Sequence, residues 1–332
     1  MKRQAASRRR LLTALPAAVA LGIAGQVGRA FGQTASYPNR LIKLVVPYPP
    51  GALTDALGRL IADHLHSSLG QTVIVENRAG AGTLLGAGAV AKGPADGYQI
   101  LIATSTTLAI SPAMFPSPAA LPTDFTGVAM IGSVSLVLVV GPDLKVTSLP
   151  ELVALIRREP GRYNFGSPGI GTMHQLIVEM VKAQEKLAAT HVPYQGSAAA
   201  LTDLITGRID FMFLDVVAAL PQVQAGKIKA IAVAAPTRLL ALPNVPTVAE
   251  IYPAIDVQAW QSIVVPKGTP EAIVKKLNIE VNRQLNDAEV RKALQMVGVV
   301  ANPMSTAALN DLIGRDVKRF GELVRTLGLR AS

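Results

Sequence analysis

The chain has 332 residues, half of them hydrophobic and only 4% aromatic, and a formal net charge of +10 at pH 7. It contains no cysteine, which excludes a disulfide framework, a thiolate nucleophile and a sulfur-ligated metal site. A chain of this length exceeds what one hydrophobic core usually holds, so we expect two domains. The aliphatic composition is typical of buried parallel strands flanked by helices, which predicts an α/β fold.

The first 32 residues have the pattern of a secretory signal peptide. Basic residues at 2–3 and 8–10 precede an apolar stretch over 11–25. The segment AFG at 30–32 then has small residues at its first and third positions, which are the two that a signal peptidase recognises. The apolar stretch is shorter than the roughly 20 residues that span a bilayer. An uncleaved anchor is the alternative, but a proline and two glycines weaken the stretch as a membrane helix. We therefore expect a periplasmic mature chain that begins near Gln33, exported by the secretory or the twin-arginine route.

The net charge of the mature chain is expected to be small. Loss of the first 32 residues removes six basic residues and no acidic one, which leaves 26 basic against 22 acidic residues. The remaining basic residues are scattered among acids, as in the segment RDVKR over 315–319, and do not form a stripe. We therefore expect no nucleic-acid partner.

Short apolar runs alternate with stretches of helical period from residue 41 onward, which predicts repeated βα units. The expected strands are 41–46, 72–77, 98–103, 163–167, 190–194, 209–214 and 229–235. Capping residues mark the expected helix starts at Thr54–Asp55, Ser148 with Glu151, Thr172 with Gln175, and Thr269–Pro270–Glu271. The expected C-terminal helices are 270–285, 288–297 and 305–327.

Two long apolar stretches, 128–141 and 257–266, do not fit this rhythm and flank a middle block of about 120 residues. They predict two crossovers between a first lobe (33–135 plus 258–332) and a second lobe (136–257). A hinge is expected where the chain crosses, near 136–141 and 256–262.

The loops that leave the strands are the candidate site, because ligands of open α/β sheets bind beyond the carboxyl ends of the strands. These loops are rich in Gly, Ser and Thr and contain neither Arg nor Lys. Three of them lead into predicted helix N-termini, whose free N–H groups attract anions. We therefore expect neutral donors to hold an anionic ligand. The candidate ligand-binding residues are Tyr48, Ala52, Leu53, Thr54, Thr104, Ser105, Ser167, Gly169, Gly171, Thr172, His174 and Asp215.

Other chemistries receive little support from the sequence. The segment Gly80–Gly86 is similar to a dinucleotide loop, but its third glycine comes one residue late, which favours a helix-entry turn. His64 and His66 lie two apart on a predicted helix and point in different directions, so we expect no metal and no cofactor. The chain lacks the G-x-S-x-G nucleophile elbow of serine hydrolases.

Two residues keep more than one interpretation. Asp215, at a predicted strand end, has three candidate roles: a helix cap, a partner for a ligand ammonium group, or a catalytic acid. Trp260 lies in the second crossover, where packing at the hinge is favoured over stacking on a ligand.

Six segments, in order, resemble the extracytoplasmic solute receptors of the tripartite tricarboxylate transporter type, also called Bug receptors. They are YPNRLIKLVVPYPPGALTDALGRLIADHL (37–65), VIVENRAGAG (73–82), PADGY (94–98), YNFGSPGIGTMHQL (163–176), HVPYQGSAAALTDLITGRIDFMF (191–213) and LPNVPTVAE (242–250). The resemblance extends from about Tyr37 to Gly328. It implies a two-lobed type II periplasmic-binding-protein fold of the α/β class, with the ligand cleft between the lobes.

The resemblance also implies a function. A receptor of this type is not an enzyme; it binds a small carboxylate, such as a di- or tricarboxylate, an acidic amino acid or an aromatic acid. It delivers that ligand to the membrane permease subunits of the transporter, and we expect it to be a monomer. The family usually has a Pro-Pro-Gly-Gly-x-Thr-Asp loop, in which this chain carries Ala52 and Leu53. Leu53 would favour ligands with an apolar portion. The alternatives are an exported α/β hydrolase or oxidoreductase, and a ligand sensor for a signalling protein.

Overall fold

The computed structural model describes residues 37–331. The predicted signal peptide over 1–32 lies outside the described residues. The helices and strands of the described residues belong to one compact unit that begins at Arg40.

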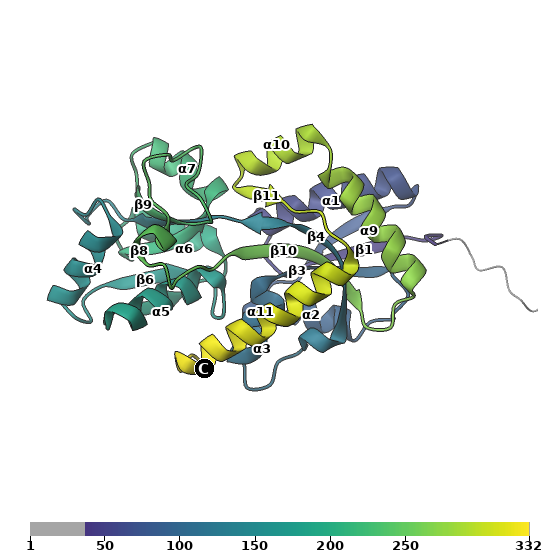
Figure 1. Cartoon of the computed structure of the whole chain (residues 1–332), viewed down its shortest axis with the longest axis horizontal. Coiled ribbons are helices and arrows are strands. Elements are labelled where there is room, and N and C mark those ends of the chain that lie inside the picture. Colours follow the sequence, from purple (N-terminus) through teal and green to yellow (C-terminus); the bar gives the residue numbers. More distant parts are fainter. Residues whose placement is uncertain (1–36, 332) are drawn as a thin grey trace, which may run out of the picture. The chain divides into compact units, whose positions relative to one another are not determined.

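The first sheet has six strands in the order β11-β4-β10-β3-β1-β2 (Figure 1). Its strands are β1 (Ile42–Val46), β2 (Val73–Asn77), β3 (Gln99–Thr104), β4 (Phe125–Val134), β10 (Ala259–Pro266) and β11 (Val299–Ala301). The first three are parallel, whereas β10 runs antiparallel to both β3 and β4. The start of β10 therefore lies at the edge where β1 and β3 end, and Gln261 pairs with Thr104 there.

Helices cover both faces of the first sheet. They are α1 (Leu53–Leu69), α2 (Leu84–Ala91), α3 (Ser111–Met114), α9 (Glu271–Leu285), α10 (Ala288–Met296) and α11 (Thr306–Thr326). Strand residues alternate between the faces: Val46 lies against Gly58 of α1, whereas Val45 packs in a cluster with Ala87 of α2 and Leu309 of α11. A π-helical turn (Thr106–Ile110) follows β3, and 3-10 turns occur at Ala81–Thr83 and Pro122–Asp124.

The second sheet has five strands in the order β7-β6-β8-β5-β9. They are β5 (Leu136–Val140), β6 (Asn164–Ser167), β7 (Thr190–Pro193), β8 (Phe211–Asp215) and β9 (Lys229–Ala234). β6 is parallel to β7 and β8, whereas β5 is antiparallel to β8 and β9. The start of β5 therefore lies beside the end of β8, where Leu136 pairs with Asp215.

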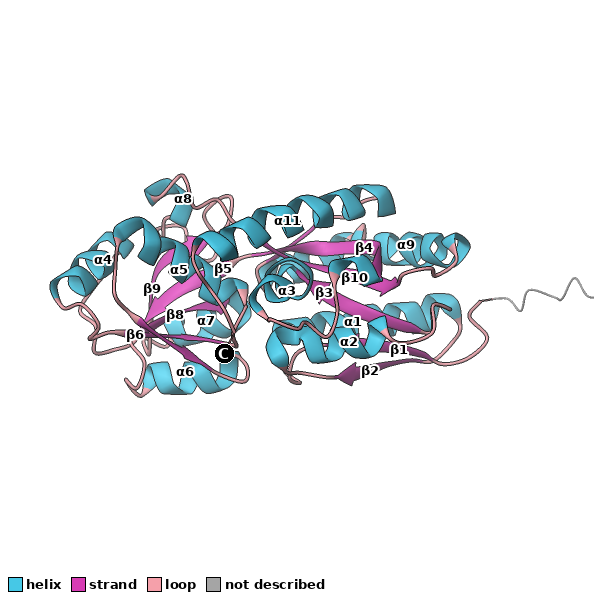
Figure 2. Cartoon of the chain, turned by 90° about the horizontal axis from the view of Figure 1, so that it is seen from below, coloured by secondary structure: helices cyan, strands magenta, loops and turns pink. Residues whose placement is uncertain are grey.

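The second sheet is also covered on both faces (Figure 2). Its helices are α4 (Leu149–Arg158), α5 (Met173–Glu185), α6 (Ser197–Ile205), α7 (Val216–Gln224) and the short α8 (Val248–Ile251). α6 and α7 pack on the face that carries Val137, Val139 and Leu214. α4 and α5 cover the face that carries Leu138, Phe211 and Phe213.

We call the first sheet with its helices the first lobe and the second sheet with its helices the second lobe. The apolar stretch over 128–141 is divided at Ser135, which lies between β4 of one sheet and β5 of the other. The chain returns between β9 and β10, over residues 235–258. Both crossings lie at the edges where the parallel strands end, which brings the strand-end loops of the two sheets together.

The expected α/β architecture is confirmed, and each predicted strand matches an observed one to within two residues. The caps at Ser148 and Thr172 are also confirmed, since their side chains accept from the backbone N–H groups of Glu151 and Gln175. Two predicted caps are wrong. α1 begins one residue earlier, with Ala52 as a cap that has no side-chain hydrogen bond. The hydroxyl of Thr269 donates to the carbonyl of Pro266 over 2.8 Å and does not cap α9.

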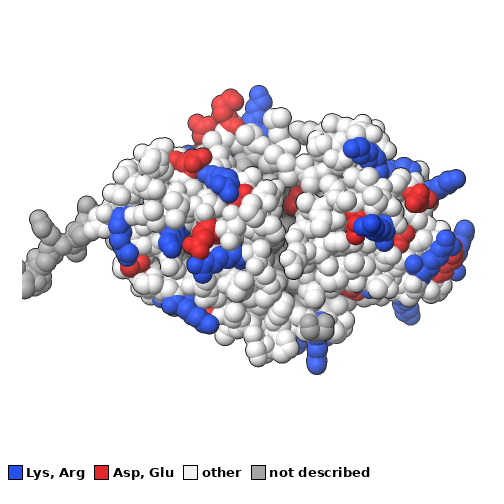
Figure 3. Space-filling view, turned by 180° about the vertical axis from the view of Figure 1, so that it is seen from behind, with Lys and Arg blue, Asp and Glu red and all other residues white. Residues whose placement is uncertain are grey.

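Surface charge is mixed on the face shown in Figure 3, where Lys and Arg side chains lie among Asp and Glu. Within residues 37–331, no helix combines the length and the hydropathy needed to cross a membrane.

Candidate functional site

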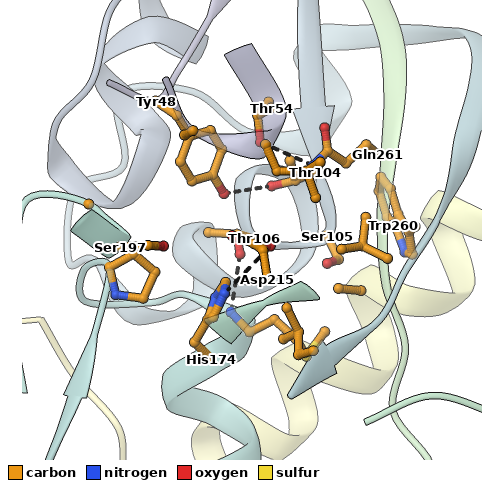
Figure 4. Close-up of a pocket in the computed structure, with 18 of the residues that line it drawn as sticks. Tyr48, Thr54, Thr104, Ser105, Thr106, His174, Ser197, Asp215, Trp260 and Gln261 are labelled. Carbon is orange, nitrogen blue, oxygen red and sulfur yellow. Dashed lines mark hydrogen bonds and ion pairs between the residues drawn. The ribbon is translucent and has the colours of Figure 1, made fainter. Parts of the chain in front are cut away.

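The strand-end loops of both lobes surround one pocket of about 40 Å³ (Figure 4). From the first lobe it is lined by the loop between β1 and α1, by the end of β3 and by the start of β10. From the second lobe it is lined by the starts of α5 and α6 and by the end of β8. A cavity of about 710 Å³ adjoins it and shares Tyr48, Pro49, Pro168 and Gly196.

The structure brings eight of the candidate residues to this pocket. They are Tyr48, Ala52, Leu53, Thr54, Thr104, Ser105, His174 and Asp215. The other four candidates, Ser167, Gly169, Gly171 and Thr172, do not line it. Among the described lining residues there is no Lys and no Arg, and Asp215 is the sole carboxylic acid.

The N-terminus of α1 faces the pocket with its first backbone N–H groups uncapped. Ala52 supplies no side-chain cap, so the N–H groups at the start of this 17-residue helix have no intrahelical acceptor. The hydroxyl of Thr54 accepts from Nε2 of Gln261 over 3.0 Å. A helix N-terminus in this state is a donor site for an anion.

Asp55, predicted to open α1, positions the loop that precedes the helix. Its carboxylate accepts from the backbone N–H of Gly51 at 2.9 Å, from Nε of Arg59 at 3.1 Å and from Nδ2 of Asn77 at 2.9 Å. Burial tends to raise the pKa of Asp55, but these hydrogen bonds outweigh it and lower the pKa below its ordinary value. The charge of Asp55 is therefore used within the loop and not in the pocket.

Hydroxyl groups form the first-lobe wall of the pocket. The phenol of Tyr48 lies 3.2 Å from Oγ1 of Thr104. Burial raises the pKa of Tyr48 to about 12, so the phenol remains a neutral donor. Oγ1 of Thr106 accepts a hydrogen bond from the backbone N–H of Met173 over 3.2 Å.

The second lobe contributes an acid and an imidazole. Nε2 of His174 lies 3.8 Å from Oδ1 of Asp215, beyond hydrogen-bond distance, and the two side chains are only 12% and 15% exposed. Neither ring nitrogen of His174 has a hydrogen-bond partner among the described residues. Burial lowers the pKa of His174 and raises that of Asp215.

The four candidates outside the pocket shape the loop between β6 and α5. Thr172 caps α5, and its hydroxyl donates to the carbonyl of Gly169 over 2.8 Å. Gly171 has a φ of +81°, and a Cβ there would lie 2.7 Å from Oγ of Ser111 in the first lobe. Ser167 is fully buried. These residues hold the loop in place, Gly171 contacts Ser111 of the other lobe, and Gly169 and Thr172 line the adjoining cavity.

Ser167 and His191 form a Ser–His pair without the geometry of a nucleophile. Oγ of Ser167 lies 2.7 Å from Nε2 of His191 and donates to the carbonyl of Gly169 at 2.9 Å. His191 is then the donor to Ser167, the reverse of a base that removes a proton. The pair lines neither the pocket nor the adjoining cavity.

Several lining residues escaped prediction from the sequence. They are Pro49, Val134, Leu136, Pro168, Met173, Gly196, Ser197, Ala259, Trp260 and Gln261. Thr106, which belongs with Thr104 and Ser105 to the predicted strand-end loop, also lines the pocket. Trp260 and Gln261 reach the pocket because β10 runs antiparallel to β3, which the sequence does not reveal. The favoured packing role of Trp260 is observed: it lies in the apolar cluster of the first lobe, and its Nε1 donates to Asp316 over 2.6 Å.

The remaining histidines and the Gly80–Gly86 segment have structural roles. Nε2 of His64 lies 2.9 Å from the carbonyl of Glu280, and Nδ1 of His66 lies 3.1 Å from the carbonyl of Gln71. A Cβ at Gly86 would lie 2.8 Å from the carbonyl of Arg78, so helix packing accounts for this glycine. Within residues 37–331, no group of three or more His, Asp or Glu side chains is placed to hold a metal ion.

A larger cavity, about 790 Å³, lies elsewhere, beside the crossing at Ser133 and Ser135. Exposed apolar side chains such as Leu240 and Met296 line it. The smaller pocket is the better candidate for binding a polar solute, because uncapped N–H groups and hydroxyls converge there at the carboxyl ends of the strands.

Known proteins resemble the chain over most of its length. Residues 57–329 match the family model described as tripartite tricarboxylate transporter family receptor. The protein BugT of Bordetella pertussis is 36% identical over 301 residues, which cover 89% of this chain and 91% of BugT.

Two similar structures were solved with carboxylates. The structure of Rpa4515 with adipate, from R. palustris, is 33% identical, with a TM-score of 0.84 and coverage of 89% of this chain and 99% of the other. MatC from Rhodopseudomonas palustris with bound malate is 31% identical, with a TM-score of 0.81 and coverage of 87% and 100%. These likenesses confirm the two-lobed periplasmic-binding-protein fold.

Proposed function

Because the chain belongs to the tripartite tricarboxylate transporter receptor family, we propose that it captures a small carboxylate in the periplasm and delivers it to the permease subunits of such a transporter. The observation that carries the proposal is the pocket between the lobes, where uncapped N–H groups of α1 converge with the hydroxyls of Tyr48, Thr104 and Thr106. The binding of adipate and malate by two similar proteins supports a carboxylate as the ligand class.

Neutral donors are sufficient for useful affinity. Micromolar binding requires about 8 kcal/mol. A hydrogen bond to a charged group contributes roughly 1.5–3 kcal/mol, and a helix N-terminus contributes up to ~2 kcal/mol. Four or five such contacts reach micromolar affinity after the entropic cost of ordering the ligand is subtracted. The N-terminus of α1, the Tyr48–Thr104 pair and Thr106 can supply that number.

Capture by two lobes requires contacts from both. A ligand that touched one lobe equally in the open and the closed forms would not shift the equilibrium between them. The pocket meets this condition, since Tyr48 and Thr104 lie in the first lobe and His174 and Ser197 in the second. We propose that the hinge lies at the two crossings, near Ser135 and before β10.

Calorimetry with a panel of carboxylates, together with a search for turnover, tests the proposed function. We expect at least one dicarboxylate or amino carboxylate to bind with micromolar Kd, to raise the melting temperature and to remain chemically unchanged. Small-angle scattering at saturation should show a smaller radius of gyration. Turnover of a bound compound would instead favour the exported enzyme, and co-purification with a signalling protein in place of permease subunits would favour the sensor.

Leu53 bears on the choice of ligand within this class. Its side chain is 4% exposed and lines the pocket at the start of α1. We expect Leu53→Gly to shift the preference away from carboxylates with an apolar portion, because the apolar contact is lost. Equal effects on adipate and on a short hydroxy acid such as malate would contradict this role.

A further inference from the structure

Asp215 lies in a pocket that is otherwise suited to anions. It ends β8, opposite Leu136 at the start of β5, and its side chain is largely buried. The pocket that it lines contains no Lys and no Arg among its described residues. A negative charge in this position has no compensating charge from the protein, apart from a protonated His174 at 3.8 Å.

The two other roles considered for Asp215 do not account for it. It occupies the N-cap position of α7, but the helix has no side-chain cap hydrogen bond, so the carboxylate is not used as a cap. The carboxylate also accepts no hydrogen bond from another described residue, in contrast to Asp55, which accepts three. Within residues 37–331, no second carboxyl group lines the pocket to form an acid–base pair with it.

His174 does not neutralise Asp215 on its own. Its ring nitrogens are buried and unpartnered, and burial disfavours its protonated form. Figure 4 shows the two side chains next to each other at the second-lobe side of the pocket, across from Tyr48 and Thr104. The backbone N–H of Asp215 itself is the one donor to this carboxylate within the described residues. A buried carboxylate with no donor from another residue is stabilised when a ligand supplies a cation or a donor at that point.

On this basis we propose that Asp215 binds a cationic nitrogen of the ligand, so that the pocket selects a carboxylate that also carries an ammonium group over a purely anionic dicarboxylate. The proposal rests on the proposed function: the donors of the first lobe hold the carboxylate of the ligand, and Asp215 of the second lobe holds its ammonium group. The two contacts together bridge the lobes. A second carboxylate in place of the ammonium group would be repelled by Asp215.

Matched ligand pairs test the proposal on the wild-type protein by calorimetry. The pairs are L-glutamate with glutarate, L-aspartate with succinate, and 6-aminohexanoate with adipate. We expect the nitrogen-containing member of any pair that binds to have at least tenfold the affinity of its partner at pH 7. This comparison does not depend on the folding of a variant.

Asp215→Asn removes the charge with little change of shape, and Asp210→Asn is its matched control, just before the other end of β8. Asp210 accepts from the backbone N–H of Asn164, a role that the amide oxygen of Asn can fill. We expect Asp215→Asn to weaken the nitrogen-containing ligand at least tenfold and to leave the plain dicarboxylate unchanged or tighter. Asp210→Asn should retain the wild-type ratio.

Three results would overturn the proposal and leave carboxylate binding intact. One is a wild-type preference for the plain dicarboxylate. The second is an equal loss of both ligands in Asp215→Asn. The third is plain-dicarboxylate binding that tightens as the pH falls and takes up a proton, which would make Asp215 a neutral donor to an anion. If no member of any pair binds, the proposed function itself fails together with this inference.

Discussion

The backbone N–H of Met173 donates to Oγ1 of Thr106 over 3.2 Å, and the two residues belong to different lobes. The bond joins the N-terminus of α5 to the turn that follows β3, beside the pocket. A hydrogen bond that exists only when the lobes meet stabilises the closed form alone and thereby strengthens ligand binding.

Thr106→Val removes this acceptor and the hydroxyl that faces the pocket. A typical hydrogen bond contributes about 1 kcal/mol, so we expect the affinity for the ligand to fall roughly fivefold or more. Thr106→Ser keeps the hydroxyl and should bind almost as well as the wild type. Thr202→Val, at an exposed position of α6, is the control. Calorimetry that finds Val and Ser at position 106 equivalent would contradict the role of the hydroxyl.

Gly171 leaves no space for a side chain where the lobes meet. Its φ is +81°, and a Cβ would lie 2.7 Å from Oγ of Ser111, which belongs to the first lobe. We expect Gly171→Ala to weaken ligand binding at least tenfold and to abolish the ligand-induced decrease in the radius of gyration.

Gly161→Ala is the matched control for this substitution. Gly161 has a similar φ of +78°, but a Cβ there would have no atom within 4 Å, so it shares the backbone strain without the contact. Both variants should lose about 1 kcal/mol of stability from strain. If both also lose affinity equally, the contact with Ser111 does not control closure.

Thr172 is expected to affect stability more than affinity. Its side chain accepts from the N–H of Gln175 at the start of α5, and it lies outside the pocket. Thr172→Val should lower the free energy of unfolding by about 1 kcal/mol, as loss of an N-cap does, and Thr172→Ser should restore it. Denaturant unfolding measures this change. If Thr172→Val instead lost much of its affinity for the ligand while its stability was unchanged, Thr172 would be a ligand-binding residue.

His191 should make stability fall in mild acid. Burial and, to a lesser extent, the charge of Lys182 lower its pKa from 6.5 to about 4. Between these values the unfolded chain binds more protons than the folded one, so the free energy of unfolding decreases as the pH falls from about 6.5 to about 4. His191→Gln should weaken this dependence, measured as the melting temperature across that range.

The exposed His66 supplies the control for this experiment, as His66→Gln. The buried His174 is retained in both variants, so its own contribution cancels in the comparison. Parallel pH profiles for His191→Gln and the wild type would show that His191 does not titrate with folding.

The strands could be predicted because buried strands require apolar runs, as in 211–214 of the predicted strand 209–214, whose observed counterpart is Phe211–Asp215. The loops at their carboxyl ends followed from the same pattern, which is why Tyr48, Thr104 and Asp215 were found. Glycines and hydroxyls in those loops are ambiguous, since Thr172 serves as a cap while Thr106 reaches the pocket. Gln261 was missed because its place depends on the antiparallel insertion of β10 between β3 and β4, a long-range pairing without local signal.

That insertion also constrains the order in which the molecule is assembled. The five strands of the second sheet come from one continuous stretch, between Leu136 and Ala234. In the first sheet, β4 and β3 are held together by β10, which begins only at Ala259. During synthesis from the N-terminus, the second sheet can therefore form before the first sheet is complete. Until about four-fifths of the chain has been synthesised, β3 and β4 lack β10, the strand that pairs with both. Their unpaired edges are exposed to other chains during that time.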